Sequence, residues 1–137
     1  MNAKIFEIPG KLRSEWDDDV KAVIDIWTDY NITLDQFKTA VLVKGVNYAK
    51  GHGGIAWIVD SQNAKGEFSA EIQNIMGTDT FPTFAKIGVK FFITIKSGFI
   101  TTNKTIDKYS SQVGPNGIQL LDMGSIDDAI LWLQANA

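Results

Sequence analysis

The stretch Ile55-Ala56-Trp57-Ile58-Val59, followed by Asp60-Ser61, decides the expected fold. It is apolar at every position rather than at alternate ones. That pattern is typical of a central parallel strand covered by helices on both faces. Asp60 and Ser61 then begin a polar loop, so this strand is expected to end there.

Strands and helices are expected to alternate after this point. The predicted elements are a helix capped by Ser69, kinked or restarted by Pro82 and ended by Gly88, a strand at 89–95, a short helix closed by Gly114-Pro115, a strand at 118–121 and a final helix capped by Ser125. Such an order predicts parallel strands joined by right-handed crossovers.

The first 54 residues predict one strand and two helices. Residues 4–8 favour a short strand that ends at Pro9-Gly10. A first helix is expected behind a capping box of Ser14 and Asp17, because its apolar residues fall at helical spacing: Trp16, Val20, Val23, Ile24 and Trp27. A second helix is expected from the capping box of Thr33 and Gln36 to the glycines Gly51, Gly53 and Gly54.

The prediction is therefore one α/β domain over residues 1–137, with a divergent part at 1–54 and strand–helix repeats at 55–137. Its single sheet would have about four strands, largely parallel, with helices packed on it.

Composition and charge exclude several function classes. A net charge of −3 favours neither nucleic acid nor an anionic membrane surface. The chain has no cysteine and one histidine, His52, so thiol catalysis and Cys- or His-rich metal sites are not expected. No run reaches the roughly 20 apolar residues of a membrane span, so no integral membrane association is expected. Residues 1–11 lack the apolar segment of a signal peptide, which predicts a cytoplasmic protein.

Four segments resemble the STAS domain family, which includes sporulation anti-sigma-factor antagonists and the cytoplasmic domains of sulfate transporters. They are Gly10-Lys11-Leu12, Trp57-Ile58-Val59-Asp60, Glu67-Phe68-Ser69 and the closing segment 125–133. The resemblance implies the fold expected above, and a function in regulatory contacts rather than chemistry.

Two departures separate the chain from typical members of that family. The Asp-Ser-Ser/Thr-Gly signature is absent, because Ala70 and Glu71 follow Ser69. The helix expected at 34–50 is an insertion before the central strand. With this inserted helix, the chain resembles the divergent STAS-like subgroup, which is similar in fold to lipid-carrying CRAL/TRIO-type domains.

Three polar residues are the candidates for a regulatory or anion-binding site: Ser69, Ser61 and Asp60. Ligands of open α/β sheets gather beyond the carboxyl ends of the strands, where helices begin, and these residues are expected at that edge. Ser69 has two interpretations. It either caps a helix or serves as a phosphorylated switch.

A surplus of aromatic residues suggests an apolar pocket or an interface. The candidates are Phe81, Phe84, Trp57 and Tyr48. No catalytic motif is present, so an enzyme, a cofactor and a metal are not expected. The sequence favours a STAS-like regulatory or scaffold protein that contacts a protein partner or a second copy. The alternative is a carrier of a small apolar ligand or lipid.

Overall fold

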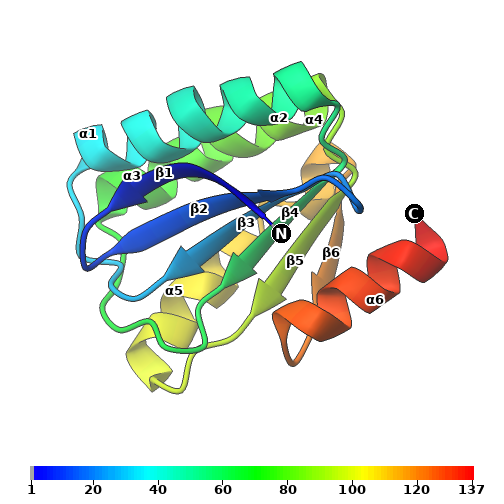
Figure 1. Cartoon of the computed structure of the whole chain (residues 1–137). Coiled ribbons are helices and arrows are strands. Elements are labelled where there is room, and N and C mark those ends of the chain that lie inside the picture. The colour runs from blue at the N-terminus through cyan, green and yellow to red at the C-terminus, as the bar shows by residue number, and fades with distance from the viewer. Residues whose placement is uncertain (1) are drawn as a thin grey trace.

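The sheet has six strands, which lie side by side in chain order (Figure 1). The structure is a computed structural model that describes residues 2–137. Met1, the first residue of the segment 1–11 discussed above, lies outside the described residues. The strands are β1 (Ala3–Ile8), β2 (Leu12–Asp17), β3 (Ala22–Trp27), β4 (Ala56–Asp60), β5 (Phe91–Ile95) and β6 (Gln119–Asp122).

The sheet is mixed. β1, β2 and β3 form an antiparallel meander, whereas β3, β4, β5 and β6 run parallel. The expected α/β class is confirmed, but the expected sheet of four largely parallel strands was wrong, because it missed the two strands that follow β1's hairpin turn.

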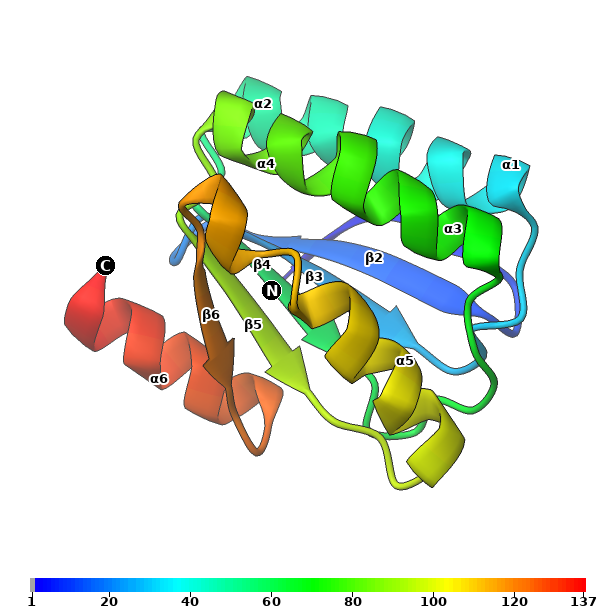
Figure 2. The same cartoon turned by 180° about the vertical axis from the view of Figure 1, so that it is seen from behind.

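Helices cover both faces of the sheet (Figures 1 and 2). One face carries α1 (Leu34–Phe37), η1 (Lys38–Gly45), α2 (Val46–His52), α3 (Ala70–Ile75), η2 (Met76–Thr80), α4 (Phe81–Ile87), α5 (Ile100–Ser110) and the short 3-10 turn η3 (Gly114–Asn116). Residues 34–52 and 70–87 are two continuous helical segments, each with π-helical turns in its middle. The other face carries α6 (Ile126–Asn136).

Residues 14–27 form strands and not the expected helix. In β2 every second side chain points into the core, and one of these, Ser14, is polar and donates a 2.5 Å hydrogen bond to Asp25 in β3. The polar residue breaks the apolar alternation that marks a strand, and β3 is buried on both faces, so its apolar run imitates a helix. The turn between them contains Lys21 with a φ of +54°.

This correction changes the N-terminal part as a whole. Residues 2–54 hold three strands and one helical segment, where one strand and two helices were expected for residues 1–54. The helical segment 34–52 is consequently the first of the molecule and connects β3 to β4.

Three expected helix starts and two expected ends are confirmed. Thr33 and Gln36 form a capping box, and the Oγ atoms of Ser69 and Ser125 accept the amides of the residues three positions later. The segment 34–52 ends at Gly53 and the segment 70–87 at Gly88, both with left-handed backbone. Pro82 lies in the first turn of α4, where its missing N–H is tolerated. The capping box of Ser14 and Asp17 was wrong, because both residues lie in β2, and the helix expected to close at Gly114-Pro115 already ends at Ser110.

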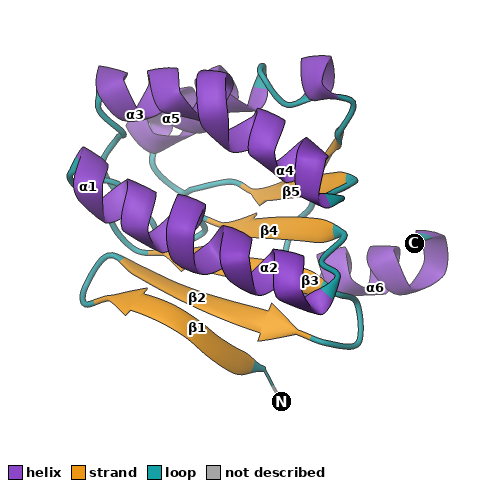
Figure 3. Ribbon diagram, turned by 90° about the horizontal axis from the view of Figure 1, so that it is seen from above, coloured by secondary structure: helices purple, strands orange, loops and turns teal. Residues whose placement is uncertain are grey.

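Two apolar cores hold these layers together. The larger core is rich in aromatic residues and lies between the sheet and the segments 34–52, 70–87 and α5; the smaller one lies between the sheet and α6. Figure 3 shows the helical layer from above, with the carboxyl ends of β3, β4 and β5 at one edge. The chain leaves that edge toward α1, α3 and α5, and these connections position the candidate site.

Candidate functional site

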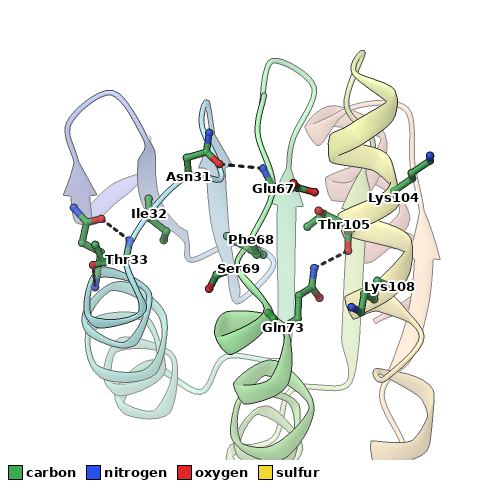
Figure 4. A pocket seen from close by; sticks show the side chains of 12 residues that line it. Asn31, Ile32, Thr33, Glu67, Phe68, Ser69, Gln73, Lys104, Thr105 and Lys108 are labelled. Atoms are coloured by element: carbon green, nitrogen blue, oxygen red, sulfur yellow. Dashed lines mark hydrogen bonds between the residues drawn. The ribbon is translucent and has the colours of Figure 1, made fainter.

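A cleft of about 640 Å³ opens at this edge of the sheet (Figure 4). Three parts of the chain line it, namely the connection from β3 to α1, the connection from β4 to α3, and the exposed side of α5. The residues at its wall include Asn31, Thr33, Glu67, Ser69, Gln73, Lys104, Thr105 and Lys108. This is the position at which open α/β sheets bind their ligands.

Hydrogen bonds between the two loops shape one wall of the cleft. The side chain of Asn31 accepts the amide of Glu67 at 3.4 Å, and the amide of Asn31 donates to Asp29 at 2.9 Å. Gly66 lies between them with a φ of +79°, and a Cβ there would come within 2.9 Å of Asn31. Only glycine combines this backbone with so close an approach, so the loop geometry depends on Gly66.

Two helical segments begin at the cleft. Thr33 Oγ1 accepts the amide of Gln36 at 3.1 Å, and Gln36 Oε1 accepts the amide of Thr33 at 2.9 Å. Ser69 Oγ accepts the amide of Ile72 at 3.2 Å. The amino ends of both segments therefore direct their partial positive charge toward this edge. The helix-capping interpretation of Ser69 is confirmed, and the exposed position of Ser69 leaves the switch interpretation open as a prediction.

Gln73 is one of several residues of the cleft that the sequence did not predict as site residues. Its side chain is only 6% exposed, and Nε2 donates a long 3.5 Å hydrogen bond to the carbonyl of Thr105. Its Oε1 atom has no partner among residues 2–137. A signal existed in the sequence, because Gln73 follows Ile72 on the side of the helix that packs on the sheet, where an amide is unexpected.

The charged groups of the cleft are two lysines and one carboxylate. Lys104 and Lys108 lie one helical turn apart on α5, and neither makes an ion pair with another described residue. Glu67 is the acid among the lining residues. The nearby Asp107 pairs with Lys96 at 2.8 Å, so it does not neutralise the cleft lysines. The cleft has a small excess of positive charge on a chain whose net charge is −3.

The structure separates the three predicted site residues. Ser69 lies at the cleft, and Asp60 ends β4, where its carboxylate accepts the amide of Gln62 at 3.0 Å. Ser61 is fully buried and hydrogen-bonded to the hydroxyl of Tyr30. Ser61 follows β4 at the expected edge, but its side chain points into the core rather than toward the surface. The three residues do not form one site.

A buried polar network surrounds Ser61. The Tyr30 hydroxyl also lies 3.0 Å from that of Tyr109, on α5. Burial raises the pKa of both tyrosines well above the ordinary value, so both stay neutral. Their hydroxyls link the loop after β3, the end of β4 and α5, which are the three parts that border the cleft.

Three of the four predicted aromatic pocket residues meet in the larger core. The rings of Trp57 and Phe84 stack at 4.0 Å, and Phe81 lies edge-on to Phe84 at 6.0 Å. The cavity between them measures about 20 Å³, which is room for one water molecule and not for a lipid. Tyr48 lies elsewhere, stacked on His52 at 4.0 Å. The apolar ligand stays a prediction, for which this closed core provides no space.

A carboxylate lies beside that cavity. Asp25 is 2% exposed and accepts hydrogen bonds from Ser14 at 2.5 Å and from the Trp57 indole at 2.8 Å. Burial raises the pKa of Asp25 to about 6, although both hydrogen bonds act in the opposite direction. No other acidic residue among residues 2–137 is buried as deeply as Asp25. Its hydrogen-bond partners, Ser14 and Trp57, are themselves buried in the core.

Comparison with known proteins finds no match to any family model, curated protein or solved structure. Within residues 2–137, no three His, Cys, Asp or Glu side chains cluster closely enough to hold a metal ion. None of the helices formed by these residues has the length and apolarity needed to cross a membrane.

Proposed function

We propose that this chain is a STAS-like regulatory module that carries out no reaction of its own and acts by contact with another protein at the carboxyl edge of the sheet. The observation that carries the proposal is the pair Phe99 and Ile100, which begin α5 at this edge and are 54% and 76% exposed. Single exposed apolar residues are ordinary on protein surfaces, but two consecutive ones form a patch that a partner can cover.

The surroundings of this pair indicate the partner's chemistry. Lys104 follows Ile100 by one helical turn and makes no ion pair with another described residue. Ser97 fixes the chain before the pair, because its hydroxyl donates to the carbonyl of Ala64 at 2.6 Å and accepts the amide of Phe99 at 2.9 Å. The pair is thus held on an ordered support, which lowers the entropy lost on binding. The fitting partner is a protein with an apolar pocket and acidic residues around it.

The test compares two exposed apolar sites on opposite faces. The double variant Phe99→Ser/Ile100→Ser removes the patch, and Leu131→Ser is the control, since Leu131 is 63% exposed on α6. Both variants should keep the wild-type melting temperature. Partners are captured from the source cells by cross-linking and quantified by mass spectrometry, and the affinity of each recovered partner is then measured with purified proteins.

We expect the double variant to lose binding by about thirtyfold or more, the effect of removing an interface hot spot. The Leu131→Ser variant should bind as the wild type does. Equal binding by all three proteins would contradict the proposal, and so would a wild-type chain that binds no protein. Sedimentation velocity distinguishes a second copy of the chain from a different partner, because only self-association makes the sedimentation coefficient depend on concentration.

A further inference from the structure

We propose that the cleft between α1, α3 and α5 binds a small phosphorylated metabolite that also carries a hydroxyl or N–H group. The starting point is Gln73, which is only 6% exposed. Its Oε1 atom has no hydrogen-bond donor among residues 2–137. A buried acceptor without a partner destabilises the fold, because it has lost its hydrogen bonds to water. A ligand with a hydrogen-bond donor would provide the missing partner, and a bare apolar ligand would not.

The amide orientation of Gln73 supports this assignment. Nε2 points to the carbonyl of Thr105 on α5, which leaves Oε1 as the free end of the amide (Figure 4). Exchanging the two atoms would place the carbonyl oxygen against another carbonyl oxygen. The amide orientation of Gln73, a residue that lines the cleft, is therefore defined by its neighbour on α5, and a ligand that reaches the buried Oε1 atom must donate to it.

The anionic part of the ligand follows from the charges. Lys104 and Lys108 of α5 both line the cleft at which the helical segments 34–52 and 70–87 begin. The Lys108 side chain points toward Gln73, whereas that of Lys104 extends outward from α5 (Figure 4). Ala70 lines this space, and its backbone amide makes no hydrogen bond to another described residue. Lysine ammonium groups and free amides at a helix start are the usual partners of phosphate. Glu67 disfavours a highly charged ligand such as a triphosphate and accepts a hydroxyl group instead.

Size and polarity limit the ligand further. A volume of about 640 Å³ lies within the usual range of small-molecule sites, and most residues that line the cleft are polar or charged. These features match a phosphate monoester of a sugar, a polyol or a nucleoside. A phospholipid headgroup has the same chemistry, and the experiment below separates the two sources.

The test is isothermal titration of the full chain with glycerol 3-phosphate, ribose 5-phosphate, adenosine 5′-monophosphate and inorganic phosphate, with glycerol as the uncharged control. We expect at least one monoester to bind with a Kd of about 0.1–1 mM, more tightly than inorganic phosphate, and glycerol not to bind. Vesicles of phosphatidylglycerol form a separate arm. Binding to vesicles without binding of any soluble monoester would overturn the proposal.

Three variants locate the binding. Lys104→Glu/Lys108→Glu should weaken the binding of every phosphate compound at least about tenfold. The matched control Lys50→Glu/Lys90→Glu makes the same charge change at exposed lysines away from the cleft and should leave binding unchanged. Gln73→Leu should reduce the preference for the monoester over inorganic phosphate, because it removes the acceptor and keeps the lysines.

The absence of saturable binding by all three monoesters below about 10 mM would overturn the proposal. Equal weakening by the control and the cleft variants would overturn it too, because the binding would then reflect net charge alone. No protein partner takes part in these titrations, so the failure of the ligand site and the failure of the proposed protein contact can be told apart.

Discussion

Replacing Asp25 by Asn should remove a pH-dependent contribution to the stability of the chain. Burial raises the pKa of Asp25 to about 6, whereas the unfolded chain has the ordinary value of 3.8. Above pH 6 the folded protein must keep a charged carboxylate away from water. The difference of about 2 pKa units corresponds to about 3 kcal/mol at 1.36 kcal/mol per unit.

The sign follows from proton binding. As the pH falls below about 6, the folded state takes up a proton on Asp25 before the unfolded state does, so this residue makes the folded state more stable. The gain is about 1.4 kcal/mol per pH unit and is complete once the pH falls below 3.8. Between pH 7.5 and pH 4.5 it amounts to about 2 kcal/mol. The Asn variant lacks this gain.

Asn also preserves the local geometry. Its carbonyl oxygen can accept the Trp57 indole N–H, and its amide group can donate to the Ser14 hydroxyl. The assay is urea unfolding of the wild type and Asp25→Asn at pH 7.5, 6.0 and 4.5, followed by tryptophan fluorescence. The exposed Asp127→Asn variant controls for the general effect of losing one negative charge.

We expect the wild type to gain about 2 kcal/mol relative to Asp25→Asn between pH 7.5 and pH 4.5. The Asp127→Asn variant should follow the wild type. A constant difference in unfolding free energy between wild type and Asp25→Asn at all three pH values would refute the reasoning, because it would mean that Asp25 titrates alike in the folded and unfolded chain.

The remaining predictions concern the first helical segment, 34–52. Gly45→Ala should destabilise the fold by about 1–3 kcal/mol, because its Cβ would lie 2.9 Å from the Trp57 ring. Gly51→Ala, with open space around the new Cβ, should instead stabilise it by up to about 1 kcal/mol; equal effects of the two changes in thermal unfolding would contradict this pair. Thr33→Ala should cost about 1 kcal/mol in the same assay, since it removes the cap that accepts the Gln36 amide; an unchanged melting temperature would show that this cap contributes nothing.

The part of the fold from β4 onward could be predicted because its signals are local. Ser69 and Ser125 cap helices with their own side chains, and Gly88 ends a helix through its own left-handed backbone. Each of these interactions spans only a few residues, so the residue types at the right spacing are enough. The apolar stretch at β4 is also explained locally by burial on both faces.

The N-terminal part could not be predicted in this way, because its decisive interaction is not local. Ser14 faces the core only because Asp25, 11 residues away, accepts its hydrogen bond, and Trp57 completes the contact from β4. From the sequence alone, Ser14 was expected to cap a helix and not to face a core. The Asp17-Asp18-Asp19 run was expected at the start of a helix, with Asp17 in its capping box, but it leads into a turn in which the Asp17 side chain accepts the amide of Asp19.

The candidate site was predicted in position but not in composition. Ser69 lies at the carboxyl edge as expected from the order of strands and helices. Ser61 follows β4 directly and shares that edge, yet its side chain turns inward to Tyr30, which no spacing rule reveals. Gln73 and the lysines of α5 approach each other from segments more than 30 residues apart, so only the fold brings them into one cleft.

The most direct test of the account is a titration of ¹⁵N-labelled protein with ribose 5-phosphate, followed by two-dimensional NMR. We expect saturable shifts of the Ala70 backbone amide, of the Gln73 side-chain amide and of amides around Lys104 and Lys108, because these residues line the cleft. Shifts confined to other parts of the surface, or no saturable shift at all, would contradict the assignment of the carboxyl edge as the binding site.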